Sequence, residues 1–139
     1  MRVSVIYWSG TGNTETMAQL IKEGAESTGA EVFLKPVSEA SEEDITGVDV
    51  SFLGCPSMGD EALEDSEFEP YIAKVESLVG GKRLGLFGSY GWGSGLWMEN
   101  WSERMRGAGA KLVGDSLIVN EAPSGEDIEK CKNFGKLLS

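Results

Sequence analysis

Histidine is absent from this chain of 139 residues, and cysteine occurs only twice, at Cys55 and Cys131. Without histidine there is no Ser-His-Asp or Cys-His nucleophile, no imidazole general base and no His-ligated zinc site. The two cysteines form no Cys-x-x-Cys motif, which argues against a disulfide framework or a thiol-redox site. We therefore interpret both cysteines as core residues of a reduced protein.

Long apolar runs are also absent. No run approaches the ~18 residues of a membrane span, and the apolar stretch at residues 3–8 is too short for the core of a signal peptide. With 40% hydrophobic and 25% charged residues, the composition is that of a soluble globular protein. We predict a cytoplasmic protein with no membrane contact, built as a single domain over residues 1–139.

Positive charge is missing from one quarter of the chain. The sequence has 12 Lys+Arg against 23 Asp+Glu, a formal net charge of −11. The segment between Pro36 and Ala73, called the acid segment below, has no Lys or Arg and holds the whole excess of acids: Glu39, Glu42, Glu43, Asp44, Asp49, Asp60, Glu61, Glu64, Asp65, Glu67 and Glu69. Such a chain lacks the basic surface that binds nucleic acid or anionic lipid.

Strand-like and helix-like segments alternate along the sequence. Runs of β-branched and aromatic residues predict strands at 2–8, 31–35, 48–54, 83–88 and 111–120. Apolar residues at helical spacing predict helices at 13–28, 66–78, 98–108 and 125–138, and Ser66 to Glu69 reads as a capping box for the second. This alternation predicts an α/β fold, an open parallel sheet with helices on both faces. Ligands of such sheets bind outside the carboxyl ends of the strands.

The loop after the first predicted strand reads Ser9-Gly10-Thr11-Gly12-Asn13-Thr14. Its glycines let the backbone curl at a helix N-terminus, and its hydroxyl and amide side chains add donors, which together make a cradle for an anion of phosphate size. An ordinary glycine turn with a helix cap is the alternative. A P-loop would need a Lys after the last glycine. A dinucleotide fingerprint would need a third glycine where Glu15 stands.

The loops after the third and fourth predicted strands carry residues suited to a planar ring. One loop contains Ser57-Met58-Gly59-Asp60-Glu61, with a thioether and a glycine whose peptide can reorient cheaply. The other contains Ser89-Tyr90-Gly91-Trp92, two aromatics in a stretch that we interpret as too glycine-rich for a strand. Aromatic rings among glycines suit stacking on a planar ligand. Taken singly, Met58 and Trp92 are equally well explained as packing residues.

Together these motifs resemble those of short-chain flavodoxins. The resemblance spans the chain and rests on residues 7–15, 53–55, 58–61 and 86–93 and on Pro123. It implies a three-layer flavodoxin-like fold, with a five-stranded parallel sheet of order 2-1-3-4-5. It also implies one non-covalent FMN that carries single electrons at low potential between redox enzymes, in place of ferredoxin, through the semiquinone/hydroquinone couple.

The resemblance also implies a role for each loop. Loop 9–14 would hold the FMN phosphate through Ser9, Thr11, Asn13 and Thr14, with Gly10 and Gly12 shaping the turn. The ring would be contacted by Ser57, Met58, Gly59, Asp60, Glu61, Ser89, Tyr90, Gly91 and Trp92. Among these, Met58 and Trp92 would cover the two ring faces, the Gly59 carbonyl would turn toward N5–H, Glu61 would pair with the N3 edge and Gly91 would donate to the pyrimidine end. Pro56 stands where some relatives have a serine that touches phosphate, and Asn120 is a candidate for the ribityl chain.

The sequence supplies no acid, base or nucleophile for a substrate, which favours an electron carrier over an enzyme. We expect a monomer whose acids from Asp60 to Glu69 oppose charge on the reduced ring and meet basic docking surfaces of ferredoxin- or flavodoxin-dependent oxidoreductases. The acids from Glu39 to Asp49 are expected on a solvated face. A small flavin-dependent reductase of the same fold is the main alternative, and it would need a nicotinamide-nucleotide site. A receiver would want paired acids where Ser9 and Gly10 stand, and a small phosphatase would want an Arg where Glu61 stands.

Overall fold

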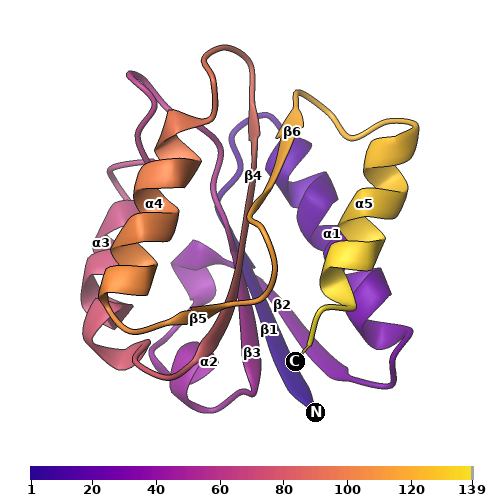
Figure 1. Cartoon of the computed structure of the whole chain (residues 1–139), viewed down its shortest axis with the longest axis vertical. Helices are drawn as coiled ribbons and strands as arrows, with labels where there is room; N and C mark the ends of the chain where they lie inside the picture. Colours follow the sequence, from indigo (N-terminus) through magenta and orange to yellow (C-terminus); the bar gives the residue numbers. More distant parts are fainter. Residues whose placement is uncertain (139) are drawn as a thin grey trace.

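The computed structural model describes residues 1–138 and places one parallel sheet between two layers of helices (Figure 1). The strands are β1 (Arg2–Tyr7), β2 (Glu31–Pro36), β3 (Val50–Gly54), β4 (Arg83–Tyr90), β5 (Lys111–Leu112) and β6 (Leu117–Asn120). Their order is β2-β1-β3-β4-β5, with β6 also paired to β4, and every pairing between these strands is parallel. The predicted fold class and strand order are confirmed. Ser139, the last residue of the predicted domain, lies outside the described residues.

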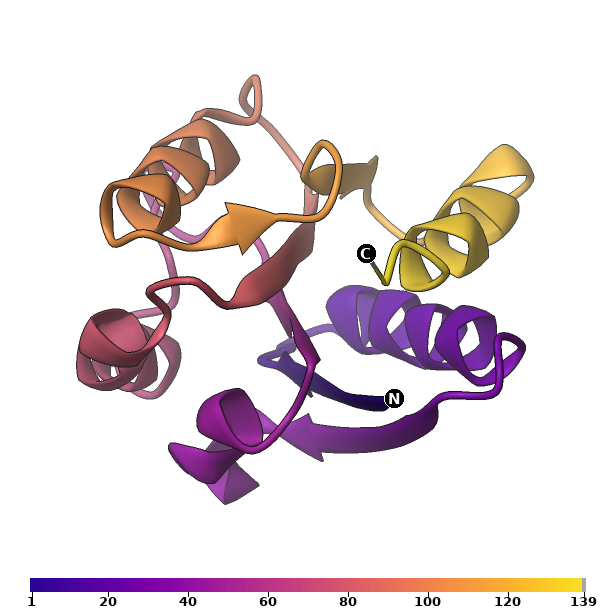
Figure 2. The same cartoon turned by 60° about the horizontal axis from the view of Figure 1, so that its bottom comes forward.

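Helices cover both faces of this sheet. Helices α1 (Asn13–Glu26) and α5 (Glu126–Gly135) lie side by side on one face, and α2 (Glu43–Thr46), α3 (Phe68–Val75) and α4 (Leu96–Gly107) lie on the other (Figures 1 and 2). Two glycines allow the close packing of α1 on α5, because a Cβ on Gly24 would lie 1.9 Å from the Lys132 carbonyl oxygen and one on Gly135 would lie 2.1 Å from that of Ile21. None of the helices within residues 1–138 has the length and apolar character that crossing a bilayer requires.

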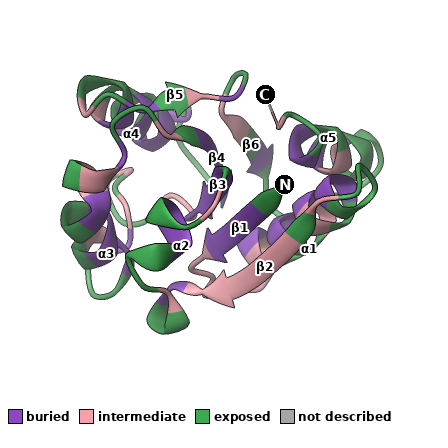
Figure 3. Ribbon diagram, turned by 90° about the horizontal axis from the view of Figure 1, so that it is seen from below, coloured by how far each residue is buried: buried purple, intermediate pink, exposed green. Residues whose placement is uncertain are grey.

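The core is divided by the sheet into two clusters of buried side chains. One cluster lies under α3 and α4 and includes Leu53, Ile72, Trp97 and Trp101. The other lies under α1 and α5 and includes residues from β1, β3 and both helices. Strand β3 is buried along its whole length, as a central strand covered on both faces must be, while the edge strand β2 is half-buried (Figure 3).

The prediction of one continuous strand over residues 111–120 is wrong. The segment divides into β5 and β6, and the connection between them contains Gly114 with φ +75°. The prediction that Ser89 and Tyr90 lie outside a strand is also wrong, because β4 continues through them and pairs them with Val119 and Asn120. Gly88 permits this continuation, since a Cβ there would lie 2.1 Å from the carbonyl oxygen of Cys55.

The predicted capping box at Ser66 is also wrong. Helix α3 begins at Phe68, and Glu67 at its N-cap makes no side-chain capping bond. The carboxylate of Glu64 takes this place, accepting the backbone N–H groups of Ser66, Glu67 and Phe68 at 2.8, 2.8 and 2.9 Å. The helix ends at Val75 in a 3-10 turn, Glu76–Leu78. The carboxylate of Glu64, two residues before the predicted serine, therefore caps this helix.

The acids from Glu39 to Asp49 do not form a uniformly solvated face. This part of the acid segment contains a 3-10 turn, Val37–Glu39, and the four-residue α2, neither of which has enough apolar residues to show a periodicity. Asp44 is buried, pairs with Lys35 Nζ at 3.0 Å and accepts the backbone N–H of Ser41 at 2.8 Å. Its negative charge is therefore used inside the fold.

Candidate functional site

A cavity of about 470 Å³ opens where β1, β3 and β4 end. It brings the three predicted loops together: the lining residues are Trp8, Ser9, Gly10, Thr11, Asn13, Thr14, Pro56, Ser57, Met58, Ser89, Tyr90, Gly91, Glu121 and Ala122. Five residues predicted for the site do not line it, namely Gly12, Gly59, Asp60, Glu61 and Trp92. The cavity lies at the carboxyl edge of the sheet, where parallel sheets bind their ligands.

The loop between β1 and α1 presents unused donors to this cavity. Gly12 has φ +97°, which turns the chain into the helix. Within residues 1–138, no hydrogen bond engages the backbone N–H groups of residues 10, 11, 13 and 14. These groups lie at the N-terminus of a 14-residue helix, whose dipole favours an anion there.

Ser9 shapes this loop from inside. Its Oγ accepts the N–H of Gly12 at 3.1 Å and that of Glu15 at 3.3 Å. A hydroxyl that accepts two bonds still carries one hydrogen to donate. Ser9 therefore both holds the loop in its curled form and retains one donor for a ligand.

Thr14 and Ser89 join this loop to the sheet. Their hydroxyl oxygens are 2.8 Å apart, and both residues are buried. The pair connects the first turn of α1 to β4, and both residues line the cavity. Thr14, predicted to hold the phosphate, is thus hydrogen-bonded to Ser89, which was predicted to contact the ring.

The turn after Met58 is closed by its own backbone. Met58 and Ala62 exchange two N–H···O bonds, each of 2.8 Å. Inside this turn Gly59 has φ +52° and Glu61 has φ +55°, so two residues adopt the left-handed region. A Cβ on Gly59 would meet no atom within 4 Å, so the backbone angle and not the available space favours glycine there.

Glu61 joins this turn to helix α4. Its Oε1 accepts the N–H of Gly95 at 3.1 Å and that of Leu96 at 3.0 Å, which caps the helix. The capping brings the carboxyl group so close to the next loop that a Cβ on Gly93 would lie 2.6 Å from it. Oε2 makes no hydrogen bond within residues 1–138, and the predicted pairing of this side chain with the N3 edge of a ring stays a prediction.

Trp92 lies in the loop between β4 and α4, and its side chain is 63% exposed. Met58, which lines the cavity, is also exposed, at 36%. The chain on either side of Trp92 is fixed, because Tyr90 packs on Trp97 with ring centroids 5.7 Å apart and Trp97 donates its Nε1–H to the Cys55 carbonyl at 3.1 Å. Two large apolar side chains thus stand exposed on anchored loops beside the cavity, as a site for a planar ligand requires.

Four lining residues are not among those predicted to hold the ligand: Trp8, Pro56, Glu121 and Ala122. Of these, the resemblance marked only Pro56, as a position that lacks a phosphate donor. Trp8 and Pro56 adjoin predicted loops, so their neighbours gave a signal. Glu121 and Ala122 follow β6 and no motif marks them; Glu121 has φ +59° and its N–H binds the Tyr90 carbonyl at 2.8 Å. Asn120 donates its side-chain amide to the same carbonyl at 3.2 Å, and its proposed contact with a ribityl chain stays a prediction.

The electrostatics of the site are those of neutral donors beside acids. None of the described residues that line the cavity is Lys or Arg. Glu64, just beyond the 58–62 turn, is buried, which by itself would raise its pKa; the hydrogen bonds from Ser66, Phe68 and Glu67 outweigh that effect and lower its pKa to about 2. Burial raises the pKa of the Cys55 thiol to about 12, which disfavours the thiolate that a nucleophilic cysteine needs.

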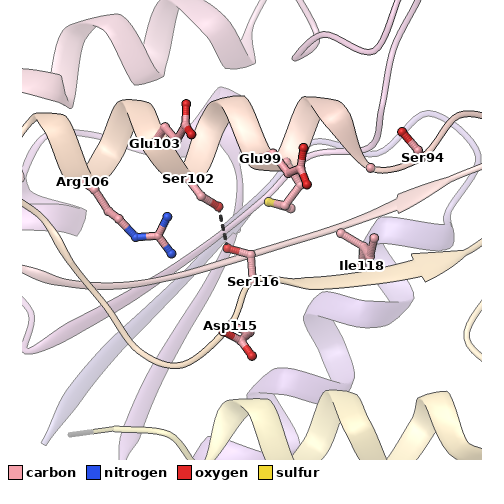
Figure 4. A pocket seen from close by; sticks show the side chains of 10 residues that line it. Ser94, Glu99, Ser102, Glu103, Arg106, Asp115, Ser116 and Ile118 are labelled. Carbon is pink, nitrogen blue, oxygen red and sulfur yellow. Dashed lines mark hydrogen bonds between the residues drawn. The ribbon is translucent and has the colours of Figure 1, made fainter.

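A second cavity, of about 550 Å³, lies between α4 and the chain around β6 (Figure 4). Its floor includes a hydrogen bond of 2.8 Å between the hydroxyls of Ser102 and Ser116, and Arg106 and Glu103 stand at its side (Figure 4). It contains none of the residues predicted for the site and no lining residue from loop 9–14 or from β1. Among residues 1–138, no group of three or more His, Cys, Asp or Glu side chains is placed to hold a metal ion.

A loop with unused N–H groups after β1 and a cavity that it shares with the loops after β3 and β4, on a sheet of order 2-1-3-4-5, define a flavodoxin-like α/β protein. The flavodoxin family model matches residues 5–135. The chain is 45% identical over 137 residues to a flavodoxin of Clostridium beijerinckii, covering 99% of both chains. It is also 45% identical over 134 residues to a flavodoxin of Megasphaera elsdenii, covering 96% of both.

The structural comparison agrees with the sequence comparison. The solution structure of two-electron reduced Megasphaera elsdenii flavodoxin matches with a TM-score of 0.90 and 43% identity, covering 98% of this chain and 97% of that one. The chain belongs to the flavodoxin family. It is a flavin-binding electron carrier and not an enzyme, which confirms the resemblance drawn from the loop motifs.

Proposed function

We propose that this flavodoxin carries single electrons at low potential on one non-covalent FMN, through the semiquinone/hydroquinone couple, and so takes the place of ferredoxin between redox enzymes. The observation that carries the proposal is the set of unused N–H groups at residues 10, 11, 13 and 14, all of which line a cavity of about 470 Å³. This volume falls within the roughly 300–1,000 Å³ of small-molecule sites.

The donor set suits the phosphate monoester of FMN. Thr11 and Asn13 line the cavity beside the backbone donors, and Ser9 keeps one hydrogen to donate. Neutral donors at a helix N-terminus hold phosphate without a cation. Pro56 also lines the cavity, but it has no backbone N–H and no hydroxyl to donate to a phosphate. We therefore place the phosphate on loop 9–14.

The rim of the cavity suits the flavin ring. Met58 and Trp92 are the exposed apolar groups there, and we propose that they cover its two faces. Bound FMN supplies the one-electron chemistry itself. The chain orients the ring and sets its charge environment: Asp60 and Glu61 bring negative charge to one side of it, which disfavours adding an electron to the ring and lowers the potential.

Exposed acids near the cavity indicate the kind of partner surface that this protein meets. We propose a cytoplasmic monomer of one domain, residues 1–139, that meets basic surfaces of ferredoxin- or flavodoxin-dependent oxidoreductases. The support is the acid excess of the sequence and its placement, since Asp60, Asp65 and Glu67 are exposed in the segment that follows the cavity. Complementary charge of this kind increases the rate of encounter with a basic partner.

The test compares FMN with riboflavin, which has the same ring and lacks the phosphate. Flavin-free protein is titrated with each, and quenching of flavin fluorescence gives Kd. We expect FMN to bind one to one and far more tightly than riboflavin. Thr11→Val should weaken FMN binding roughly tenfold to a hundredfold, because a hydrogen bond to a charged group contributes about 1.5–3 kcal/mol. Riboflavin binding should stay within twofold of wild type.

Thr28→Val is the matched control, because its hydroxyl binds the Ala25 carbonyl at the far end of α1. It should leave both affinities unchanged. Equal affinity for FMN and riboflavin in the wild-type protein would contradict the placement of the phosphate on loop 9–14.

A further inference from the structure

Trp8 forms a wall between the site and a smaller cavity behind it. It lines the cavity of about 470 Å³ and also one of about 230 Å³ that contains Glu15 and Glu67. Its backbone is fixed to the sheet, since its N–H donates to the Gly54 carbonyl at 3.0 Å. Trp8 therefore borders both the site and a cavity that contains two carboxylates, and Ser9 of loop 9–14 lines both as well.

The indole also supports the loop directly. A Cβ on Gly10 would lie 3.1 Å from Cη2 of Trp8 and 3.3 Å from Cζ3, so the ring is packed against the backbone at Gly10. Gly10 and Thr11 carry two of the four unused N–H groups. A change in the orientation of the indole would therefore change the direction of those donors.

That orientation is held by Glu67. Trp8 donates its Nε1–H to Oε1 of Glu67 at 3.2 Å, across 59 residues of sequence. Glu67 is itself fixed, because its N–H donates to the buried Glu64 carboxylate at 2.8 Å. A continuous series of contacts thus runs from the N-terminus of α3 through Glu67 and Trp8 to Gly10.

We infer that Glu67 is a positioning residue for the FMN phosphate, acting through the Trp8 indole on the backbone donors of Gly10 and Thr11. The inference rests on the proposed FMN site. It assigns an exposed member of the acid segment a role that its charge alone would oppose, since a carboxylate near a phosphate repels it. Hydrogen bonding and charge therefore have opposite effects at this position, and the two can be separated.

The experiment measures Kd for FMN and for riboflavin with six proteins: wild type, E67Q, E67L, W8F, the double variant E67L/W8F and the control E99L. Gln at 67 keeps an oxygen that accepts the indole N–H and removes the charge. Leu removes both, and Phe at 8 keeps a ring without the donor. E99L, which removes an exposed acid on α4, is the control for lost surface charge.

We expect E67L and W8F each to weaken FMN binding about threefold to tenfold, the range for loss of one hydrogen bond. Riboflavin affinity should stay within twofold. E67Q should bind FMN at least as tightly as wild type. The Kd of the double variant for FMN should not exceed the larger Kd of the two single variants, because both changes break the same contact.

A second readout needs no flavin. In ¹⁵N-labelled flavin-free protein the indole N–H of Trp8 gives one NMR signal, identified by its loss in W8F. E67L should shift that signal and leave the signals of Trp97 and Trp101 in place, and E67Q should shift it less.

The inference is overturned if E67L and W8F leave FMN affinity within twofold of wild type, or if they weaken FMN and riboflavin in parallel, since a phosphate-positioning role acts on FMN alone. Failure of the wild-type protein to bind either flavin would instead contradict the proposed function, and this inference with it.

Discussion

Glu64 offers the sharpest test of how the acid segment stabilises the fold around the site. The residue is 5% exposed, and its two oxygens accept three backbone N–H groups and the hydroxyl of Ser66 at the start of α3. In Glu64→Gln, an amide NH₂ replaces one of those oxygens and faces a donor. The variant therefore loses the charge at the helix N-terminus and places two donors against each other.

The magnitude follows from the pKa of Glu64, which the hydrogen bonds lower from an ordinary 4.5 to about 2 despite its burial. At about 1.4 kcal/mol per pKa unit, ionised Glu64 contributes about 3 kcal/mol to the free energy of unfolding. Because the folded-state pKa is the lower one, this contribution is fully present above about pH 5. It is lost progressively as the pH falls toward 2.

The assay is urea unfolding of the flavin-free protein, followed by far-UV circular dichroism at pH 7, 5 and 3. We expect E64Q to be about 2–3 kcal/mol less stable than wild type at pH 7 and the difference to shrink at pH 3. Asp65→Asn, which removes a neighbouring exposed charge, should lie within about 0.5 kcal/mol of wild type at every pH. An E64Q variant as stable as wild type at pH 7, or a difference that does not shrink at pH 3, would refute this account of the cap.

Three further predictions concern the loops of the site. Gly59→Pro should bring the two one-electron potentials of the bound flavin closer together, because proline cannot adopt the φ of +52° that this residue has. Spectroelectrochemistry measures the separation of the two potentials, and an unchanged separation would exclude a role for this peptide. The double variant Asp60→Asn/Asp65→Asn should raise the lower one-electron potential of the bound flavin by about 20–40 mV. Each unit charge about 10 Å away contributes about 0.4 kcal/mol in water, and ~1.4 kcal/mol corresponds to ~59 mV. A rise in potential that persists undiminished in 1 M salt would argue against a charge effect. Gly88→Ala should lower the stability by about 1–3 kcal/mol because its Cβ would meet the Cys55 carbonyl at 2.1 Å, whereas Gly107→Ala, with open space, should not; equal melting temperatures for the two variants would contradict the close approach of β4 to β3.

Much of the fold could be predicted from the sequence because its periodicities are clear. The buried run at β3 and the apolar stripe of α1 each show one unambiguous pattern, and the strand order came from the family resemblance. The errors arose where a tertiary contact decides the local structure. Strand β4 continues through Ser89 and Tyr90 only because β6 pairs with them, and Gly88 gives no local sign of the close approach that it permits.

The candidate site shows the same division. The loops were found from their glycines and polar residues, and the cavity does join them. The interactions that hold the loops in place could not be predicted from the sequence. Glu64 caps a helix that begins several residues later, and Glu61 caps one that begins more than thirty residues later. As a run of charges, the acid segment gives no indication of which carboxylates are buried, which cap helices and which face solvent.

Single-electron transfer is tested most directly by a stepwise reductive titration of the FMN-loaded protein under anaerobic conditions, followed by visible absorption. We expect electrons to enter one at a time, with the spectrum of a one-electron reduced flavin accumulating before full reduction. We expect no rapid oxidation of NADH or NADPH by the protein alone. Direct conversion of oxidised to fully reduced flavin in a single two-electron step, or rapid turnover of a nicotinamide nucleotide, would contradict the proposed function.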